Sequence, residues 1–133
     1  FKFNIILVIR IMRKFLVLIF CILSFQVSAM EKKTTFDKDL FQKAQDDGKV
    51  VVVSSWIKYC SSCAGQMKIL QKAEKDFENI KYFSFEVTNK EISNLFKVEY
   101  QTTLLIFKNN EEIYRSIGET SKEKIYKAIE SSI

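Results

Sequence analysis

Apolar and polar positions recur along residues 31–133 with periods that predict alternating helices and strands. Four segments repeat an apolar residue every three or four positions, as amphipathic helices do: 36–47, 61–77, 91–98 and 121–131. Four shorter runs are rich in β-branched and aromatic residues, as strands are: 50–55, 80–87, 103–108 and 112–117. The turn pair Asn109-Asn110 separates the last two runs, which indicates a hairpin.

The order of these segments predicts the fold class. A strand–helix–strand unit gives parallel neighbouring strands, and a hairpin adds antiparallel ones. We therefore expect an α/β domain with a mixed central sheet and helices on both of its faces. The run 50–55 is continuously apolar at its start, which is typical of a strand covered on both faces. The aromatic side chains Phe83, Phe85 and Phe107 are expected in the core.

The first 29 residues have the layout of an export signal rather than of a domain. From Met12 the chain continues with the basic pair Arg13-Lys14, an eleven-residue hydrophobic region (15–25) and small residues that end at Ala29. This layout predicts a signal peptide, with an upstream extension before Met12, that is cleaved after Ala29 and precedes a domain spanning 30–133. We expect a periplasmic or otherwise extracytoplasmic protein without a stable membrane span in its mature form.

A membrane tether formed by an uncleaved N-terminus is the alternative. The hydrophobic region is much shorter than the roughly 20 apolar residues that a spanning helix needs. Joining it to the apolar run before Arg10 would bury Arg10, Arg13 and Lys14 in hydrocarbon, which is costly. Cleavage is therefore the favoured interpretation.

The composition is that of a globular protein, with 47% hydrophobic, 14% aromatic and 28% charged residues. The formal net charge is +5, but four basic residues and no acidic ones precede residue 30. The remaining 17 basic and 16 acidic residues nearly balance, so the mature domain has no basic cluster that would attract nucleic acid. We expect protein partners and a monomeric domain.

The cysteine and histidine residues of the chain limit the kinds of catalytic and metal-binding site that it can form. The chain has no His, which excludes Ser–His and Cys–His catalytic pairs and His-ligated zinc. Of its three cysteines, Cys21 lies in the hydrophobic region, which leaves the pair Cys60 and Cys63. Their C-x-x-C spacing indicates redox or metal chemistry. Zinc needs four ligands and the mature chain supplies two thiols, so we expect no resident metal or cofactor.

Cys60 and Cys63 stand where the strand 50–55 is followed by the helix 61–77, for which Ser61 or Ser62 is the expected N-cap. Unpaired backbone N–H groups and the positive end of the helix dipole favour a thiolate there. Such an environment lowers a cysteine pKa from about 8.5 to between about 3.5 and 7.5. Cys60 is then the nucleophile, and Cys63 attacks the resulting mixed disulfide. A chance pair, a zinc half-site completed by another chain and a structural disulfide are the alternatives.

Two segments resemble the thioredoxin family. Residues 55–63, S-W-I-K-Y-C-S-S-C, are similar to the family's F-W-A-x-W-C-G-P-C, and residues 103–111, T-L-L-I-F-K-N-N-E, resemble T-L-L-L-F-K-N-G-E. Gly118 falls where the family has a glycine after its last strand. The resemblance implies a thioredoxin-like fold and thiol–disulfide exchange with protein substrates. It also implies that Cys60 is the nucleophile and Cys63 the resolving thiol.

The chain departs from the family pattern at three places. The family's cis-proline, which helps to bind the substrate backbone, corresponds to Thr102, so this peptide bond is either a strained cis bond or a trans bond in a different loop. The usual buried carboxylate corresponds to Ser54, and Ser-Ser replaces Gly-Pro between the cysteines. By resemblance Thr102 is a substrate-binding residue. Tyr59 and Trp56 are further candidates for an apolar substrate-facing rim.

The favoured function is extracytoplasmic exchange with thiols and disulfides of exported proteins, with an unidentified redox partner that resets the pair. One alternative is a thioredoxin-fold binding module, or a factor for Cu(I) or metal-site assembly, that lacks general oxidoreductase activity. No Met or His stands beside the cysteines to support a copper site. Another is a specialised reductant for apocytochrome or metal-site assembly. The sequence leaves the direction of exchange open.

Overall fold

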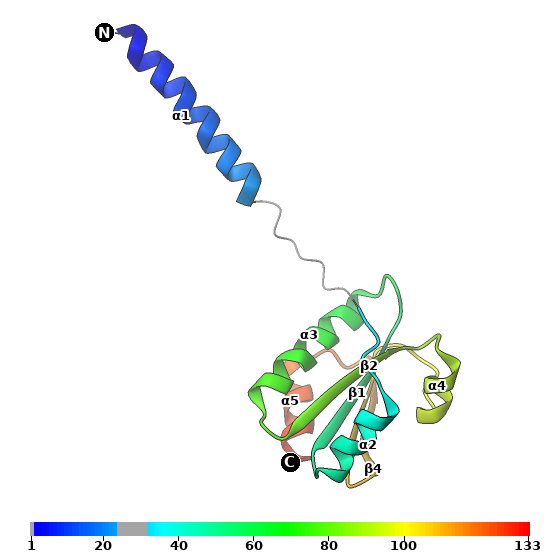
Figure 1. Cartoon of the computed structure of the whole chain (residues 1–133). Coiled ribbons are helices and arrows are strands. Elements are labelled where there is room, and N and C mark those ends of the chain that lie inside the picture. The colour runs from blue at the N-terminus through cyan, green and yellow to red at the C-terminus, as the bar shows by residue number, and fades with distance from the viewer. Residues whose placement is uncertain (1, 24–31) are drawn as a thin grey trace. The chain divides into compact units, whose positions relative to one another are not determined.

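The computed structural model describes residues 2–23 and 32–133, and the chain divides into two compact units, Phe1–Met30 and Glu31–Ile133 (Figure 1). The first unit contains helix α1 (Lys2–Leu23). Within the described residues, no helix combines the length and the apolar character that a membrane crossing requires. The expected cleavage site after Ala29 lies outside the described residues, so cleavage stays a prediction.

The second unit is built on a mixed sheet, as the sequence predicts. In the described part of the chain the sheet has four strands in the order β2-β1-β3-β4. β1 pairs in parallel with β2 and antiparallel with β3, and β3 pairs antiparallel with β4. The strands span the following residues: β1 Val50–Trp56, β2 Ile80–Glu86, β3 Thr103–Lys108 and β4 Glu111–Ile117. β1 is buried along its whole length because it has a strand on each side and helices over both faces.

Helices cover both faces of this sheet (Figure 1). α3 and α5 lie on one face, and α2 and α4 lie on the other. Their bounds agree with the sequence periodicity to within two residues: α2 Lys38–Asp46, α3 Ser61–Asp76, α4 Lys90–Phe96 and α5 Lys122–Glu130. Leu95 belongs to the apolar stripe expected for the helix at 91–98, yet about half of its surface is exposed. The buried residues of α4 are Phe96, which belongs to the same expected stripe, and Ser93.

The alternation of side chains along β1 separates two cores. Val50 and Val52 pack with residues of α3 and α5, among them Leu70 and Ile125. Residues 51 and 53 face the opposite side, where the core is largely aromatic. The rings there lie with centroids 5.0 to 6.3 Å apart, in mostly tilted or edge-on pairs: Phe36, Phe41, Phe83, Phe85, Phe96 and Phe107. The core positions expected for Phe83 and Phe85 are confirmed, whereas Phe107 is partly buried and packs against this core from its margin.

An extended segment ahead of α2 covers the outer edge of β2. The backbone N–H groups of Thr35 and Phe36 both donate to the carbonyl of Ser84. In return, the Thr35 hydroxyl accepts from the N–H of Ser84 at 2.9 Å, and the Thr34 hydroxyl accepts from the N–H of Glu86 at 3.1 Å. The hydroxyl groups of these two side chains thus accept hydrogen bonds from backbone N–H groups at the edge of β2. Without them, these N–H groups would be free to pair with a further strand.

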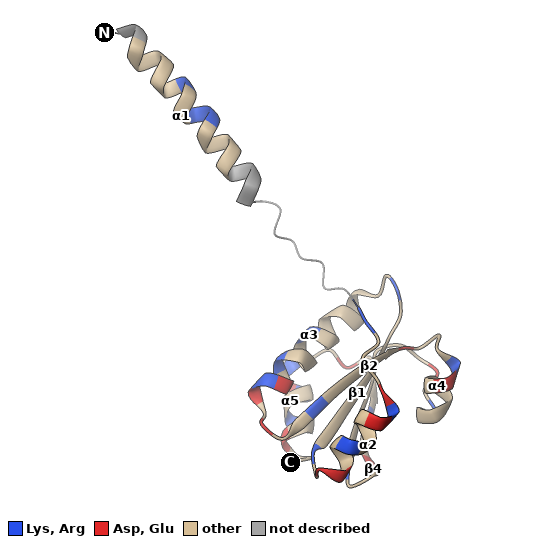
Figure 2. Cartoon of the chain, viewed as in Figure 1, with Lys and Arg blue, Asp and Glu red and all other residues tan. Residues whose placement is uncertain are grey.

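Charge is distributed differently in the two units. In Figure 2 acidic and basic residues are interspersed over the helices and strands of the second unit. The charged residues of α1 are all basic. The net positive charge of the chain therefore resides mainly in the first unit.

Candidate active site

The two cysteines lie at the start of α3, just beyond the end of β1. Their sulfur atoms are joined in a disulfide, with the Cα atoms of Cys60 and Cys63 5.3 Å apart. Cys60 has extended backbone angles, and its sulfur accepts a hydrogen bond from the N–H of Cys63 at 3.2 Å. Cys60 is therefore the N-cap of α3, and the expectation of Ser61 or Ser62 at that position is wrong. Both serines lie within the first helical turn, where their own backbone is already helical.

The two sulfurs differ in accessibility. Cys60 is partly exposed, whereas Cys63 is completely buried. The N–H of Cys63 and the positive end of the α3 dipole both face the Cys60 sulfur, and both favour negative charge on it. A disulfide of another protein can thus reach Cys60, and the start of α3 stabilises the thiolate form of Cys60 that attacks it.

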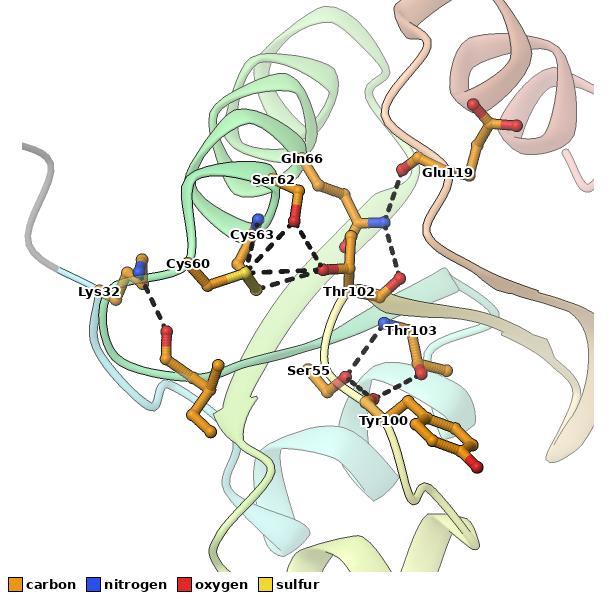
Figure 3. The surroundings of a disulfide bond; sticks show 11 residues. Lys32, Ser55, Cys60, Ser62, Cys63, Gln66, Tyr100, Thr102, Thr103 and Glu119 are labelled. Carbon is orange, nitrogen blue, oxygen red and sulfur yellow. Dashed lines mark hydrogen bonds between the residues drawn. A yellow bond between two sulfur atoms is a disulfide. The ribbon is translucent and has the colours of Figure 1, made fainter.

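Thr102 faces the cysteines from the loop between α4 and β3 (Figure 3). Its hydroxyl oxygen lies 3.2 Å from Cys63 Sγ, 3.8 Å from Cys60 Sγ and 3.3 Å from the hydroxyl oxygen of Ser62. The peptide bond before Thr102 is trans, like the others of the described residues. Of the two possibilities left by the sequence, the structure has the trans bond and a loop of different shape.

This loop holds Thr102 in a conformation that β-branched residues rarely adopt, with a φ of +58°. Backbone hydrogen bonds fix it on both sides: the N–H of Thr102 donates to the carbonyl of Ser55, and the N–H of Gly118 donates to the carbonyl of Thr102. The Ser55 hydroxyl also accepts from the N–H of Thr103 and donates to the carbonyl of Tyr100. The strain at Thr102 is thereby held in place by its surroundings.

Gln66 is a site residue that the sequence analysis missed. Its side chain is completely buried on α3, one turn after Cys63. The amide nitrogen donates to the carbonyls of Thr102 at 3.3 Å and Glu119 at 2.8 Å, while the amide oxygen has no partner among the described residues (Figure 3). The available signal was a polar residue on the apolar stripe that includes Met67 and Leu70.

The two aromatic candidates occupy different environments. Tyr59 stands fully exposed immediately before Cys60, with its own φ at +57°. Trp56 is the last residue of β1 and is buried, with 6% of its surface exposed. Tyr59 and Thr102 thus flank the cysteines from two loops. Substrate contact by these three residues stays a prediction.

Ser54, at the position of the family's buried carboxylate, makes a hydrogen bond within the core. Its hydroxyl lies 2.7 Å from the hydroxyl of Tyr82 on the neighbouring strand. Burial raises the pKa of Tyr82 well above its usual range, so this phenol stays protonated at any ordinary pH. Neither member of the pair can act as a base of moderate strength. Among the described residues, no cluster of three or more His, Cys, Asp or Glu is arranged to hold a metal ion.

Comparison with known proteins identifies relatives of this chain. The model of the family described as Thioredoxin matches residues 27–131. An H-type thioredoxin of Fagopyrum esculentum is 28% identical over 65% of this chain and 76% of its own length. The thioredoxin of Rickettsia bellii is 25% identical over 73% of this chain and 94% of its own length.

Solved structures agree with this result. The crystal structure of Trxlp from Edwardsiella tarda superposes with a TM-score of 0.65 and 28% identity, covering 71% of this chain and 94% of that one. Fasciola hepatica thioredoxin, at 19% identity, has a TM-score of 0.63 over 71% of this chain and 88% of its own, a likeness that shows the fold alone.

Proposed function

This chain belongs to the thioredoxin family and is a thiol–disulfide oxidoreductase, and from that premise we propose that it exchanges disulfides with exported proteins outside the cytoplasm. The observation that carries the proposal is the asymmetry of the pair: Cys60 is partly exposed at the tip of α3, and Cys63 is buried within reach behind it. This is the arrangement that a nucleophile and a resolving thiol require.

The exchange proceeds in two steps. In the reducing direction, the Cys60 thiolate attacks one sulfur of a substrate disulfide, and the other substrate sulfur leaves as a thiolate. Cys63 then attacks the Cys60 sulfur of this mixed disulfide, which forms the internal disulfide and releases the second substrate sulfur. Two electrons pass from the cysteine pair to the substrate. In the oxidising direction the same steps run in reverse on a substrate dithiol.

The extracytoplasmic setting is supported by the sequence before the domain. Arg13-Lys14, the hydrophobic region 15–25 and the small residues up to Ala29 have the layout of a secretory signal. Disulfides persist in oxidising compartments, where exported proteins carry them. The clients of this exchange are thus proteins that acquire or lose disulfides after export.

The proposal is tested by trapping mixed disulfides in a Gram-negative host that expresses the full chain with a C-terminal tag. Cys63→Ser removes the resolving thiol, so we expect client proteins to accumulate on Cys60 as complexes that a reductant dissociates. Non-reducing electrophoresis of the periplasmic fraction and mass spectrometry identify the trapped proteins. The chain recovered from that fraction is expected to begin at Met30.

Cys60→Ser and the double variant are the matched controls, and both should trap nothing. Equal capture by Cys60→Ser and Cys63→Ser would refute exchange through Cys60 and favour a binding module. If the trapped proteins and the chain itself are confined to the cytoplasm, the proposed location is wrong.

A further inference from the structure

Cys63 must lose a proton, and among the described residues the polar side chain in hydrogen-bond contact with its sulfur is the hydroxyl of Thr102 rather than a carboxylate or an amine. The sulfur is completely buried, and attack on the mixed disulfide requires its thiolate. The position of the family's carboxylate is occupied by Ser54, whose hydroxyl is engaged with the protonated phenol of Tyr82. The proton of Cys63 therefore needs another route to solvent.

A short row of hydroxyl groups leads from Cys63 to the surface. The hydroxyl of Thr102, itself only 3% exposed, lies 3.2 Å from Cys63 Sγ. The hydroxyl of Ser62 lies 3.3 Å from that of Thr102, and Ser62 is exposed (Figure 3). Each hydroxyl can both donate and accept a hydrogen bond, which is the property that a proton-transfer chain requires.

The hydrogens of this row can be assigned in both redox states. Disulfide sulfurs carry no hydrogen, so in the oxidised protein they can only accept: Thr102 can donate to Cys63 Sγ, and the Ser62 hydroxyl, which lies 3.3 Å from both Thr102 Oγ1 and Cys60 Sγ, can donate to either. In the reduced protein the Cys63 thiol can donate to Thr102, which then donates to Ser62. The same hydroxyl and sulfur neighbours can therefore support the row in either direction.

We propose that the hydroxyls of Thr102 and Ser62 carry the proton of Cys63 to solvent during resolution of the mixed disulfide. The proposal rests on the proposed exchange reaction and adds the residues that make its second step possible. Cys63 transfers its proton to Thr102, Thr102 transfers its own to Ser62, and Ser62 releases one to water. The Cys63 thiolate then attacks Cys60 Sγ, the bond between Cys60 and the substrate breaks, and the substrate sulfur leaves as a thiolate.

Because Thr102 contacts the reacting sulfur, this assignment makes it a catalytic residue rather than only a substrate-binding one. In the oxidising direction the same row delivers a proton inward as Cys63 becomes the leaving group. The strained backbone conformation of Thr102, which the hydrogen bonds to Ser55 and Gly118 maintain, orients its hydroxyl toward the two sulfur atoms.

The test follows the reaction of the reduced protein with Ellman's reagent by stopped flow. Attack by Cys60 releases one thionitrobenzoate, and resolution by Cys63 releases a second, so the two steps appear as separate phases. Thr102→Val keeps the branched shape and removes only the hydroxyl. We expect it to leave the first phase within about twofold and to slow the second at least about tenfold, as loss of proton transfer does.

Rescue separates proton transfer from a structural role. Thr102→Ser should restore the second phase to within about threefold of the natural protein, because it returns the hydroxyl. Ser62→Ala, at an exposed position that leaves the core intact, should also slow the second phase, and by more than the first, in which the contact of its hydroxyl with Cys60 Sγ at 3.3 Å is lost as well. Thr103→Val is the matched control: its hydroxyl donates to the Tyr100 carbonyl in the same loop, and the second phase should be unchanged.

The other possible results of these experiments contradict different parts of the proposal. A second phase of natural rate in Thr102→Val, or one that is equally slow in Thr102→Ser, overturns the proton route while the exchange reaction stands. A second phase that slows in Ser54→Ala but not in Thr102→Val assigns the route to the core pair instead. A missing first phase in the natural protein contradicts the exchange reaction itself.

Discussion

At the scale of single residues, the loop that faces the cysteines is held by hydrogen bonds from β1, from Gly118 and from α3. Left-handed backbone at a β-branched residue costs of the order of 1–3 kcal/mol. At Thr102 this cost is offset by three bonds to its backbone, one of which comes from the buried amide of Gln66. Gln66 also holds the Glu119 carbonyl ahead of α5, so one side chain ties α3 to two later segments.

Replacing Gln66 with Leu should therefore destabilise the domain. The Glu119 carbonyl loses the donor that the structure gives it, and an unpaired, partly buried carbonyl costs about 1–3 kcal/mol. Urea unfolding of the oxidised protein measures this change in the free energy of unfolding. Gln71→Leu, at an exposed position on the same helix, is the control and should change it by less than about 0.5 kcal/mol. Equal effects of the two substitutions would contradict the role of Gln66.

Residue-scale predictions succeeded where the chemistry is local in sequence. Cys60 and Cys63 could be paired from their spacing, and the structure joins them. The contacts of Gln66 could not be predicted, because its partners are backbone carbonyls 36 and 53 positions further along the chain. Every residue has a backbone carbonyl, so the sequence does not indicate which carbonyls accept a hydrogen bond from a side chain. The N-cap at Cys60 was missed because serine is the commoner capping residue.

At the scale of elements, the covered edge of β2 is the feature that periodicity could not reveal. The segment around Thr34 and Thr35 is too short to show a repeating pattern, and it pairs with β2 mainly through hydroxyl groups. An open edge strand is a template for unwanted pairing with other chains. Capping the edge with side chains blocks this pairing without a further strand.

Hydrogen exchange can resolve this capping one amide at a time. Thr35→Val removes the acceptor of the Ser84 N–H, so we expect that amide to exchange about 2- to 10-fold faster, in line with one lost hydrogen bond. Thr34→Val is the matched control, because it should affect the Glu86 amide and spare Ser84. Measurement by NMR reads both amides in each variant. Unchanged exchange at Ser84 in Thr35→Val would show that its hydroxyl does not protect the edge.

The regular elements, in contrast, followed from the pattern of side chains. The hairpin turn is an example, since Asn109 and Asn110 both adopt positive φ, as a two-residue turn of this kind demands and as asparagine tolerates. The buried strand β1 was equally predictable, because its continuous run of valines is typical of a strand covered on both faces. Leu95 deviates because α4 is short and buries only part of its apolar stripe.

At the scale of the whole molecule, the topology brings the parts of the site together. β1 lies between β2 and β3, and residues 57–60 connect its end to the start of α3. The loop before β3 is bonded to the end of β1 through Ser55, which sets Thr102 opposite the cysteines. The sequence predicted a mixed sheet with helices on both faces, but the order of its strands depends on pairings between distant segments. The resemblance to thioredoxins pointed to Thr102 as a residue of the site, and the structure adds the contacts of its hydroxyl with residues 60–63.

The central claim is that Cys60 and Cys63 form one reversible redox couple in which Cys60 is the accessible partner. Equilibration of the protein in thiol–disulfide buffers of graded potential, followed by acid quenching, alkylation and mass spectrometry, tests it most directly. We predict one two-electron transition in which both thiols appear together, at a potential between about −270 and −120 mV. In the reduced protein, limiting alkylating reagent should label Cys60 before Cys63. A pair that stays oxidised below about −300 mV, as structural disulfides do, or prior labelling of Cys63, would contradict the account.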